Sequence, residues 1–322
     1  MRSIPILLAT LWAPNALSAE VTPYIVNGTD ISASAYPDFV SLFYDRIDYD
    51  GVYGSGPYCG GTLLSSQYVL TAAHCIYGDN NYQLFTSVVP QLQNENDFPN
   101  SVQQRVMVSE YYYRSDYNDT TLANDIAILK LAQPITAVTS YADLAETADE
   151  PNYRLTSPVQ DFYAVGRGNT ETNVDSTDEL QRTLLRYVTN ADCAGIYQGV
   201  DTSENLCMNG AATVVYENAT CQGDSGGPLY WNSKQVGITS FGPQVCGDTD
   251  LNVRANSIFT EVSHHTTWIN SVLNGSETPK VTVTDSQRNL ALNPSSGGGG
   301  GGSIGLFLLS ALGFLGWKRA SK

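Results

Sequence analysis

Short apolar runs separated by turn residues dominate the chain between about residue 25 and residue 260. Within the runs apolar and polar positions alternate, or the run is continuously apolar, and Gly, Pro, Asn or Asp interrupts them. This spacing is typical of β-strands, because successive side chains of a strand point to opposite faces of a sheet. We therefore predict strands within residues 67–73, 104–113, 125–131, 235–242 and 257–262.

Helical periodicity is scarce until residues 260–273. The positions that recur there at helical spacing are Val262, His265 or Thr266, Ile269, and Val272 or Leu273, and Asn274-Gly275 follows as a stop signal. We interpret His264 and His265 as surface or packing residues of this helix. No repeat of about 20–50 residues is visible, which disfavours propellers and solenoids. The pattern predicts a β-rich domain that ends in one helix.

The last part of the chain has a different composition. Residues 276–303 are polar and end in a Gly/Ser-rich stretch, which predicts a linker that packs against no core. Residues 304–322 form a short hydrophobic segment with a basic end. About fourteen helical residues span only about 21 Å, less than the hydrocarbon core of about 30 Å. Anchoring in a membrane therefore requires the glycines to join the span, and the alternative is a transient signal.

The tail in residues 295–322 resembles the Gly-Gly C-terminal sorting signals of Gram-negative bacteria. That resemblance implies that the tail is processed and that the protein is delivered to the outer cell surface or secreted, after export through the periplasm.

The N-terminus predicts export. Arg2, an apolar run from Ile4 to Trp12 and a small-residue exit at Leu17-Ser18-Ala19 are typical of a signal peptide over residues 1–19. Export to an oxidising compartment makes the six cysteines candidates for three disulfides. Because no two cysteines stand in a CxxC pair, a zinc site is disfavoured. Six cysteines allow fifteen pairings, and the spacing alone does not choose among them.

Charge and composition narrow the function. The 322-residue chain is 15% charged with a formal net charge of -16, so phosphate backbones are repelled and nucleic acid is not an expected partner. The 20 tyrosines, 28 glycines and only 3 methionines are typical of a secreted all-β protein. We expect a monomer that needs no cofactor and no metal ion.

Three segments carry the groups that acyl transfer requires, namely a nucleophile, a base, a carboxylate that orients the base, and donors for an oxyanion. Ser225 lies in "TCQGDSGGPL", between glycines that allow backbone N–H groups to approach a substrate. His74 follows an apolar run in "LTAAHC", and Asp125 opens the alternating segment in "ANDIAILKL".

The segments "TAAHC", "NDIAIL" and "GDSGGP", in this order, resemble the trypsin/chymotrypsin family of serine proteases over about residues 25–275. The resemblance implies two six-stranded antiparallel β-barrels, at about residues 25–135 and 150–260, with the site in the cleft between them. It also implies a serine endopeptidase acting on proteins or peptides, with His74 as base and acid, Asp125 as its orienting group and Ser225 as nucleophile. The N–H groups of Gly223 and Ser225 would form the oxyanion hole.

The same resemblance implies a disulfide pairing and an activation step. The implied disulfides are Cys59–Cys75, Cys193–Cys207 and Cys221–Cys246. In the family a cut releases an Ile-Val terminus, whose ammonium is buried against the aspartate before the nucleophile, here Ile25 and Asp224. A buried charge needs a partner, so each group requires the other. Residues 20–24 would then be the activation peptide.

Two positions depart from a trypsin-like pattern. Tyr24 stands before the cut, where Arg or Lys is usual, and Ala219 stands where trypsins have a specificity aspartate. Together with Gly242 and Ser257 as pocket walls, Ala219 predicts a preference for apolar or aromatic residues before the scissile bond, since an ammonium there would be unpaired. The alternative is that Asp248 or Asp250 folds back and restores cleavage after Arg or Lys.

Two other functions fit parts of the sequence. "GDSGG" also matches the G-x-S-x-G elbow of α/β-hydrolases, and Asp250 and His264 follow it in the order that this fold uses. An elbow needs a helix after the serine, however, and strand-like sequence follows here. A catalytically inactive adhesin or binding protein with the same barrels is the second alternative.

Polar loop residues complete the predictions. We interpret four glycosylation sequons as turns, and residues 94–97 as a solvated loop rather than a calcium site. The sequons begin at Asn27, Asn118, Asn218 and Asn274.

Overall fold

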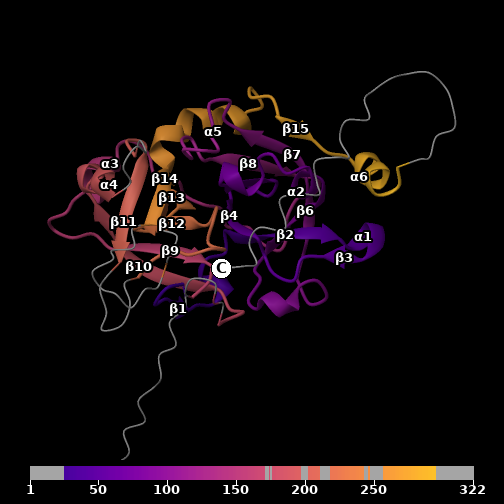
Figure 1. The fold of residues 1–322 in the computed structure, drawn as a ribbon, viewed down its shortest axis with the longest axis horizontal. Helices are drawn as coiled ribbons and strands as arrows, with labels where there is room; N and C mark the ends of the chain where they lie inside the picture. The colour runs from indigo at the N-terminus through magenta and orange to yellow at the C-terminus, as the bar shows by residue number, and fades with distance from the viewer. Residues whose placement is uncertain are drawn as a thin grey trace, which may run out of the picture.

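Two closed six-stranded antiparallel β-barrels lie side by side (Figure 1), which confirms the predicted fold class. The computed structural model describes residues 25–170, 174, 176–196, 202–210, 218–242, 246 and 257–294. The predicted signal peptide (residues 1–19), the predicted activation peptide (residues 20–24) and residues 295–322 lie outside the described residues.

The first barrel closes because β7 pairs with both β6 and β8. Its strands are β2 (Phe39–Arg46), β4 (Cys59–Leu63), β5 (Tyr68–Thr71), β6 (Thr86–Pro90), β7 (Val106–Tyr113) and β8 (Ala127–Leu131), and the short β3 (Val52–Tyr53) pairs with β2. Short helices connect them: η1 (Ala33–Ala35), α1 (Ile47–Asp50), η2 (Ala73–Cys75), α2 (Asn80–Phe85) and η3 (Glu95–Asp97).

The second barrel closes through the pairing of β9 with β10. Its strands are β9 (Phe162–Gly166), β10 (Gln181–Val188), β11 (Asn205–Gly210), β12 (Pro228–Trp231), β13 (Lys234–Phe241) and β14 (Ser257–Glu261), with helices α3 (Glu150–Tyr153) and α4 (Asn190–Ile196). The short β1 (Thr29–Asp30) also pairs with β10, with Thr29 opposite Arg182. The N-terminal segment therefore joins the second barrel, not the first barrel as its place in the sequence suggested.

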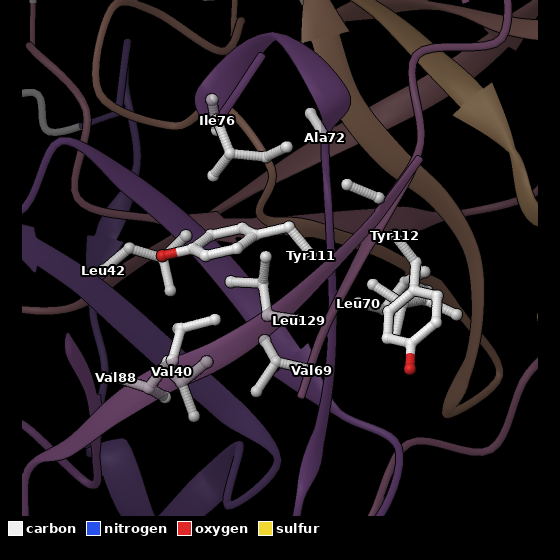
Figure 2. Close-up of a cluster of buried hydrophobic side chains, with 14 of the residues drawn as sticks. Val40, Leu42, Val69, Leu70, Ala72, Ile76, Val88, Tyr111, Tyr112 and Leu129 are labelled. Carbon is white, nitrogen blue, oxygen red and sulfur yellow. The ribbon is translucent and has the colours of Figure 1, made fainter. Parts of the chain in front are cut away.

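The alternation that predicted the strands fills the first barrel with side chains. Val40 and Leu42 of β2 point into the same core as Val69, Tyr111 and Leu129 from three other strands (Figure 2), and all five are fully buried. Burial of one such aliphatic side chain contributes about 1.5–3 kcal/mol, so the inward residues hold the barrel closed.

The predicted terminal helix is present as η4 (Val262–His265) and α5 (Thr266–Leu273). Val262, Ile269 and Val272 pack into the core of the first barrel, although the helix follows the last strand of the second barrel. His265 is also buried, and burial lowers its pKa to about 4. The helix thus joins the two barrels.

Residues 276–294 correct the predicted linker. They form β15 (Val281–Thr282), which pairs with β7, and helix α6 (Asp285–Leu292), which lies on the outer side of the first barrel (Figure 1). The N–H groups of Lys280 and Val283 donate to the carbonyls of Tyr111 and Ser109, both at 2.8 Å. The segment extends the sheet because β7 offers backbone groups that β6 does not reach.

Arg288 fixes helix α6 to the barrel. The residue is only 2% exposed, and its guanidinium donates to the carbonyls of Leu84 (2.6 Å) and Val108 (2.5 Å) and to Asp285 (2.8 Å). Thr284 and Gln287 form a capping box at the start of the helix. A polar composition therefore does not prevent packing here, because the buried contacts are hydrogen bonds to backbone carbonyls.

Among the described residues, no helix has both the length and the apolar character that a membrane span requires.

Replacement of Arg288 should release the C-terminal segment. We expect Arg288→Ala to lower the local free energy of opening by about 2 kcal/mol, because two buried carbonyls lose their charged donor. Hydrogen exchange of the Lys280 and Val283 amides should become about 30-fold faster. The control is Arg186→Ala, at an exposed arginine with one long ion pair. Equal exchange in the two variants would show that Arg288 does not hold the segment.

Candidate active site

The carboxylate of Asp125 is buried just before β8 and accepts hydrogen bonds from residues of both barrels. Its Oδ1 accepts a hydrogen bond from the His74 backbone N–H (2.9 Å), and its Oδ2 lies 2.7 Å from His74 Nδ1. From the second barrel, the Ser240 hydroxyl donates to Oδ2 (2.5 Å). Asp125 is fully buried, so these donors replace the water that the charge has lost.

His74 lies on η2, directly after β5. Ala72 and Ala73 are buried before it, and the disulfide between Cys59 and Cys75 ties the following residue to β4. The backbone of His74 is thereby fixed on both sides. The His74 side chain keeps about a quarter of its surface exposed, whereas Asp125 is fully buried.

Ser225 is positioned by the backbone around it. Its carbonyl accepts a hydrogen bond from Gly60 of β4 (2.8 Å), and the N–H of Gly226 donates to Thr239 of the second barrel (2.9 Å). A Cβ on Gly226 would lie 2.2 Å from Thr71 Oγ1 and 2.5 Å from the Gly60 carbonyl oxygen, so only glycine allows the serine loop to approach the first barrel this closely. The hydroxyl of Ser225 has no hydrogen-bond partner among the described residues.

The predicted oxyanion donors are also available. Gly223 has φ +106, and a Cβ there would lie 2.8 Å from Gly168 Cα, so glycine is required. In the described part of the chain, no acceptor bonds the N–H of Gly223 or of Ser225.

Asp224 points away from Ser225 into the second barrel. Its Oδ1 accepts from the Gly168 N–H (2.7 Å) and its Oδ2 from the Cys221 N–H (2.8 Å). The residue is 1% exposed, and a Cβ on Gly168 would lie 2.5 Å from the carboxylate. The fold therefore encloses this carboxylate.

Ile25 and Val26 are both fully buried. Val26 packs in a cluster with Ala219, Cys221 and Cys246, next to the loop that holds Asp224. The sequence-predicted activation residues are therefore brought to the serine loop.

The predicted pocket residues are only partly brought together. Ala219 is fully buried, and the Ser257 hydroxyl accepts a hydrogen bond from the Thr220 N–H (2.9 Å). Gly242 is exposed at the end of β13. Asp248 and Asp250 lie outside the described residues.

The structure contains the three disulfides that the family resemblance implies: Cys59–Cys75, Cys193–Cys207 and Cys221–Cys246. The third bridge fixes the strand end near Gly242 to the serine loop.

The α/β-hydrolase alternative is wrong. Strand β12, not a helix, follows Ser225, and His264 of η4 contacts Glu261 at the end of β14 (3.2 Å). The histidine that meets a carboxylate at the barrel interface is His74.

The polar loops differ from their predictions in detail. Asn118 caps a turn by accepting hydrogen bonds from Thr120 and Thr121, as predicted, but Asn218 is buried with its side chain bonded. Residues 94–97 are not simply solvated, because Asn94 binds Glu179 (2.9 Å) and Asn96 binds Asp178 (2.7 Å).

Sequence reasoning missed two residues that hold Asp125. The first is Ser240, and the second is Thr260, whose hydroxyl donates to the Asp125 carbonyl (2.9 Å). Both stand in strands that read as ordinary alternating segments, so no local signal identifies them.

The environment of His74 favours its charged form. Burial disfavours the charge, but the Asp125 carboxylate attracts it and accepts a hydrogen bond, and the net effect raises the pKa of His74 above its ordinary 6.5. The raised pKa makes the neutral ring a stronger base, and its Nδ1 side is held by Asp125.

Known proteins share this sequence pattern. The chain matches the trypsin family over residues 25–269. Chymotrypsin-like elastase family member 1 of Canis lupus familiaris is 31% identical over 262 residues, covering 79% of this chain and 94% of the relative. Trypsin, alkaline C of Manduca sexta is 30% identical over 275 residues (84% and 99%), and brachyurin of Leptuca pugilator is 28% identical over 247 residues (76% and 96%).

The Asp125 interaction can be measured through the His74 ring. In Asp125→Asn the attraction is lost but the burial remains, so the pKa of His74 should fall below 6.5, by about 1–2 pH units relative to the unaltered protein. Nitrogen NMR of the imidazoles measures this directly, since the chain has only three histidines. The control Asp119→Asn, at an exposed position, should leave the His74 titration unchanged. A pKa of His74 that is equal in both variants would contradict the assigned contact.

Proposed function

The chain belongs to the trypsin family of serine proteases, and on this premise we propose that it cleaves peptide bonds by acyl transfer to Ser225, after a cut between Tyr24 and Ile25. The observation that carries the proposal is the contact between partly exposed His74 and buried Asp125, next to the segment that the serine loop approaches at Gly226. Enzymes of this kind act on proteins or peptides.

His74 acts as the base of the first step. Asp125 accepts a hydrogen bond from the N–H at Nδ1, so the proton of neutral His74 stays on Nδ1 and the lone pair is at Nε2. As Ser225 Oγ bonds to the scissile carbonyl carbon, its proton passes to Nε2, and the same proton then passes to the leaving amine. Water repeats the sequence on the acyl-enzyme, and Ser225 regains its proton.

The N–H groups of Gly223 and Ser225 stabilise the oxyanion. Their freedom from other acceptors in the described residues supports this role, because an oxyanion donor must be ready before the charge develops. Gly223 adopts its φ of +106 without strain because it lacks a Cβ, so the loop can hold this N–H in one conformation before the charge develops.

Activation would bury the new Ile25 ammonium against Asp224. In support, Ile25 already lies in a fully buried position, and Asp224 sits in an enclosed site that suits a paired charge. Ile25 has φ +32, a value that a β-branched residue rarely adopts. A cut before Ile25 removes the preceding carbonyl that makes this value unfavourable.

The substrate pocket favours an apolar or aromatic side chain before the scissile bond. Ala219 offers no charge to a buried ammonium or guanidinium, and Ser257 is already engaged by a backbone donor. The relatives carry both elastase and trypsin names, so they do not decide this preference. Cleavage after Arg or Lys through Asp248 or Asp250 is the alternative.

Export and the fate of the tail are further parts of the proposal. Residues 1–19 would be removed during export, and residues 295–322 would direct the protein to the outer surface of a Gram-negative cell and be trimmed near the glycines. The docked helix α6 would remain with the mature enzyme.

Loss of the nucleophile should abolish turnover. We expect Ser225→Ala to lower kcat for a peptide substrate by about 10⁶-fold, whereas Ser233→Ala in an exposed turn should leave it unchanged. Both proteins should be compared after N-terminal sequencing shows a start at Ile25. Full activity of Ser225→Ala, or of a chain that still carries Tyr24, would contradict the proposal.

Peptide libraries test the pocket. Substrates with Tyr, Phe or Leu before the cut should have kcat/KM values at least about 100-fold above those with Arg or Lys, because an unpaired buried charge costs several kcal/mol. The matched variant Ala219→Asp should shift the preference towards Arg and Lys. Faster turnover of Arg substrates by the unaltered enzyme would favour the acidic-loop alternative instead.

A further inference from the structure

A side-chain hydrogen bond joins two asparagines that are far apart in the sequence. The amide of Asn27 donates to the Oδ1 of Asn218 at 2.6 Å. Asn218 is only 6% exposed, and its own amide donates to the Leu184 carbonyl of β10 at 2.9 Å. Asn218 is therefore held by the second barrel on one side and holds Asn27 on the other.

The two ends of this bond belong to the two segments that activation must bring together. Asn27 stands two residues after Ile25, and its φ of +65 is one that asparagine tolerates well. Asn218 directly precedes Ala219, the residue at the base of the proposed pocket. Beside the hydrogen bond, Val26 packs against Ala219.

We propose that Asn27 and Asn218 are positioning residues that couple the docking of the Ile25 terminus to the substrate pocket. This inference rests on the proposed function, since it assigns the pair a role in the activated enzyme. Neither residue touches the reacting atoms. The bond stabilises the docked state of residues 25–28. It also holds Asn218, and with it the adjacent Ala219 at the base of the proposed pocket.

The pair should be visible in the alkaline limb of the pH profile. The terminal amine of Ile25 docks when it is charged, so activity falls when high pH removes the proton. Tighter docking of the charged form moves this loss to higher pH, because the docked state keeps the proton. In the proposed activated enzyme the amine pairs with Asp224, and the neighbouring Arg167 is directed elsewhere, to the carbonyls of Gln93 and Asp178 and to Glu95. A weaker docking bond therefore lowers the midpoint directly.

The first test compares mature Asn27→Gly with the unaltered enzyme. Glycine accepts a positive φ but offers no amide, and loss of one such hydrogen bond should weaken docking about fivefold. The midpoint of the alkaline loss of kcat/KM should then fall by about 0.7 on the pH scale. Asn232→Gly is the control, at another asparagine with positive φ in the exposed β12–β13 turn, and should leave the midpoint unchanged.

A double-mutant cycle separates the hydrogen bond from the flexibility that glycine adds. Asn218→Ala should lower the midpoint as Asn27→Gly does. In the double variant the midpoint should fall by clearly less than the sum of the two single decreases, because the bond is already absent in each single variant. The backbone effect of glycine is present in both arms of the cycle and cancels.

Two outcomes would overturn the role of the pair in an active enzyme: equal midpoints for Asn27→Gly and the unaltered protein, or full additivity in the cycle. If the unaltered mature protein had no peptidase activity at all, the proposed function would fail and the role of the pair with it. The two failures are thus distinguishable.

Discussion

Burial of the Asp125 carboxylate between the two barrels is the constraint on which the site depends. A charge removed from water costs several kcal/mol unless hydrogen bonds replace the solvent. Here one partner, His74, comes from the first barrel, and another, Ser240, comes from the second. The carboxylate is satisfied only when the barrels meet in one arrangement, and that arrangement brings the imidazole to the serine loop. The same requirement thus fixes both the packing of the barrels and the geometry of the site.

Segments at both ends of the domain reinforce this arrangement, because each packs against a barrel to which it does not belong in sequence order. The N-terminal segment runs from buried Ile25 through β1 onto the second barrel, where it reaches the serine loop. At the other end, α5 and the extension through α6 pack on the first barrel. The N-terminal contacts lie next to Ala219, a residue proposed for substrate binding, whereas helix α6, which carries Arg288, lies on the outer side of the first barrel (Figure 1). The N-terminal contacts are therefore suited to control activity, whereas the contacts of helix α6 hold the C-terminal end of the described domain.

Much of the fold and the core of the site could be predicted from local sequence. Strand alternation and the helical spacing around Ile269 are periodic patterns, and the segments around His74, Asp125 and Ser225 are short motifs. The contacts that were missed connect residues distant in sequence. Arg288 binds backbone carbonyls, which every residue carries, so nothing in a polar tail indicated that it would pack. Likewise, Asn218 reads as a turn residue until β10 and Asn27 are brought to it.

Trapping the covalent intermediate tests the acyl-transfer mechanism most directly. The mature protein should be mixed with an activated ester whose acyl group leaves slowly, quenched in acid and digested for mass spectrometry. The mechanism predicts one acyl group per chain, on the peptide that contains Ser225, and loss of that adduct in His74→Ala. Turnover without an adduct, or an acyl group on another residue, would contradict it.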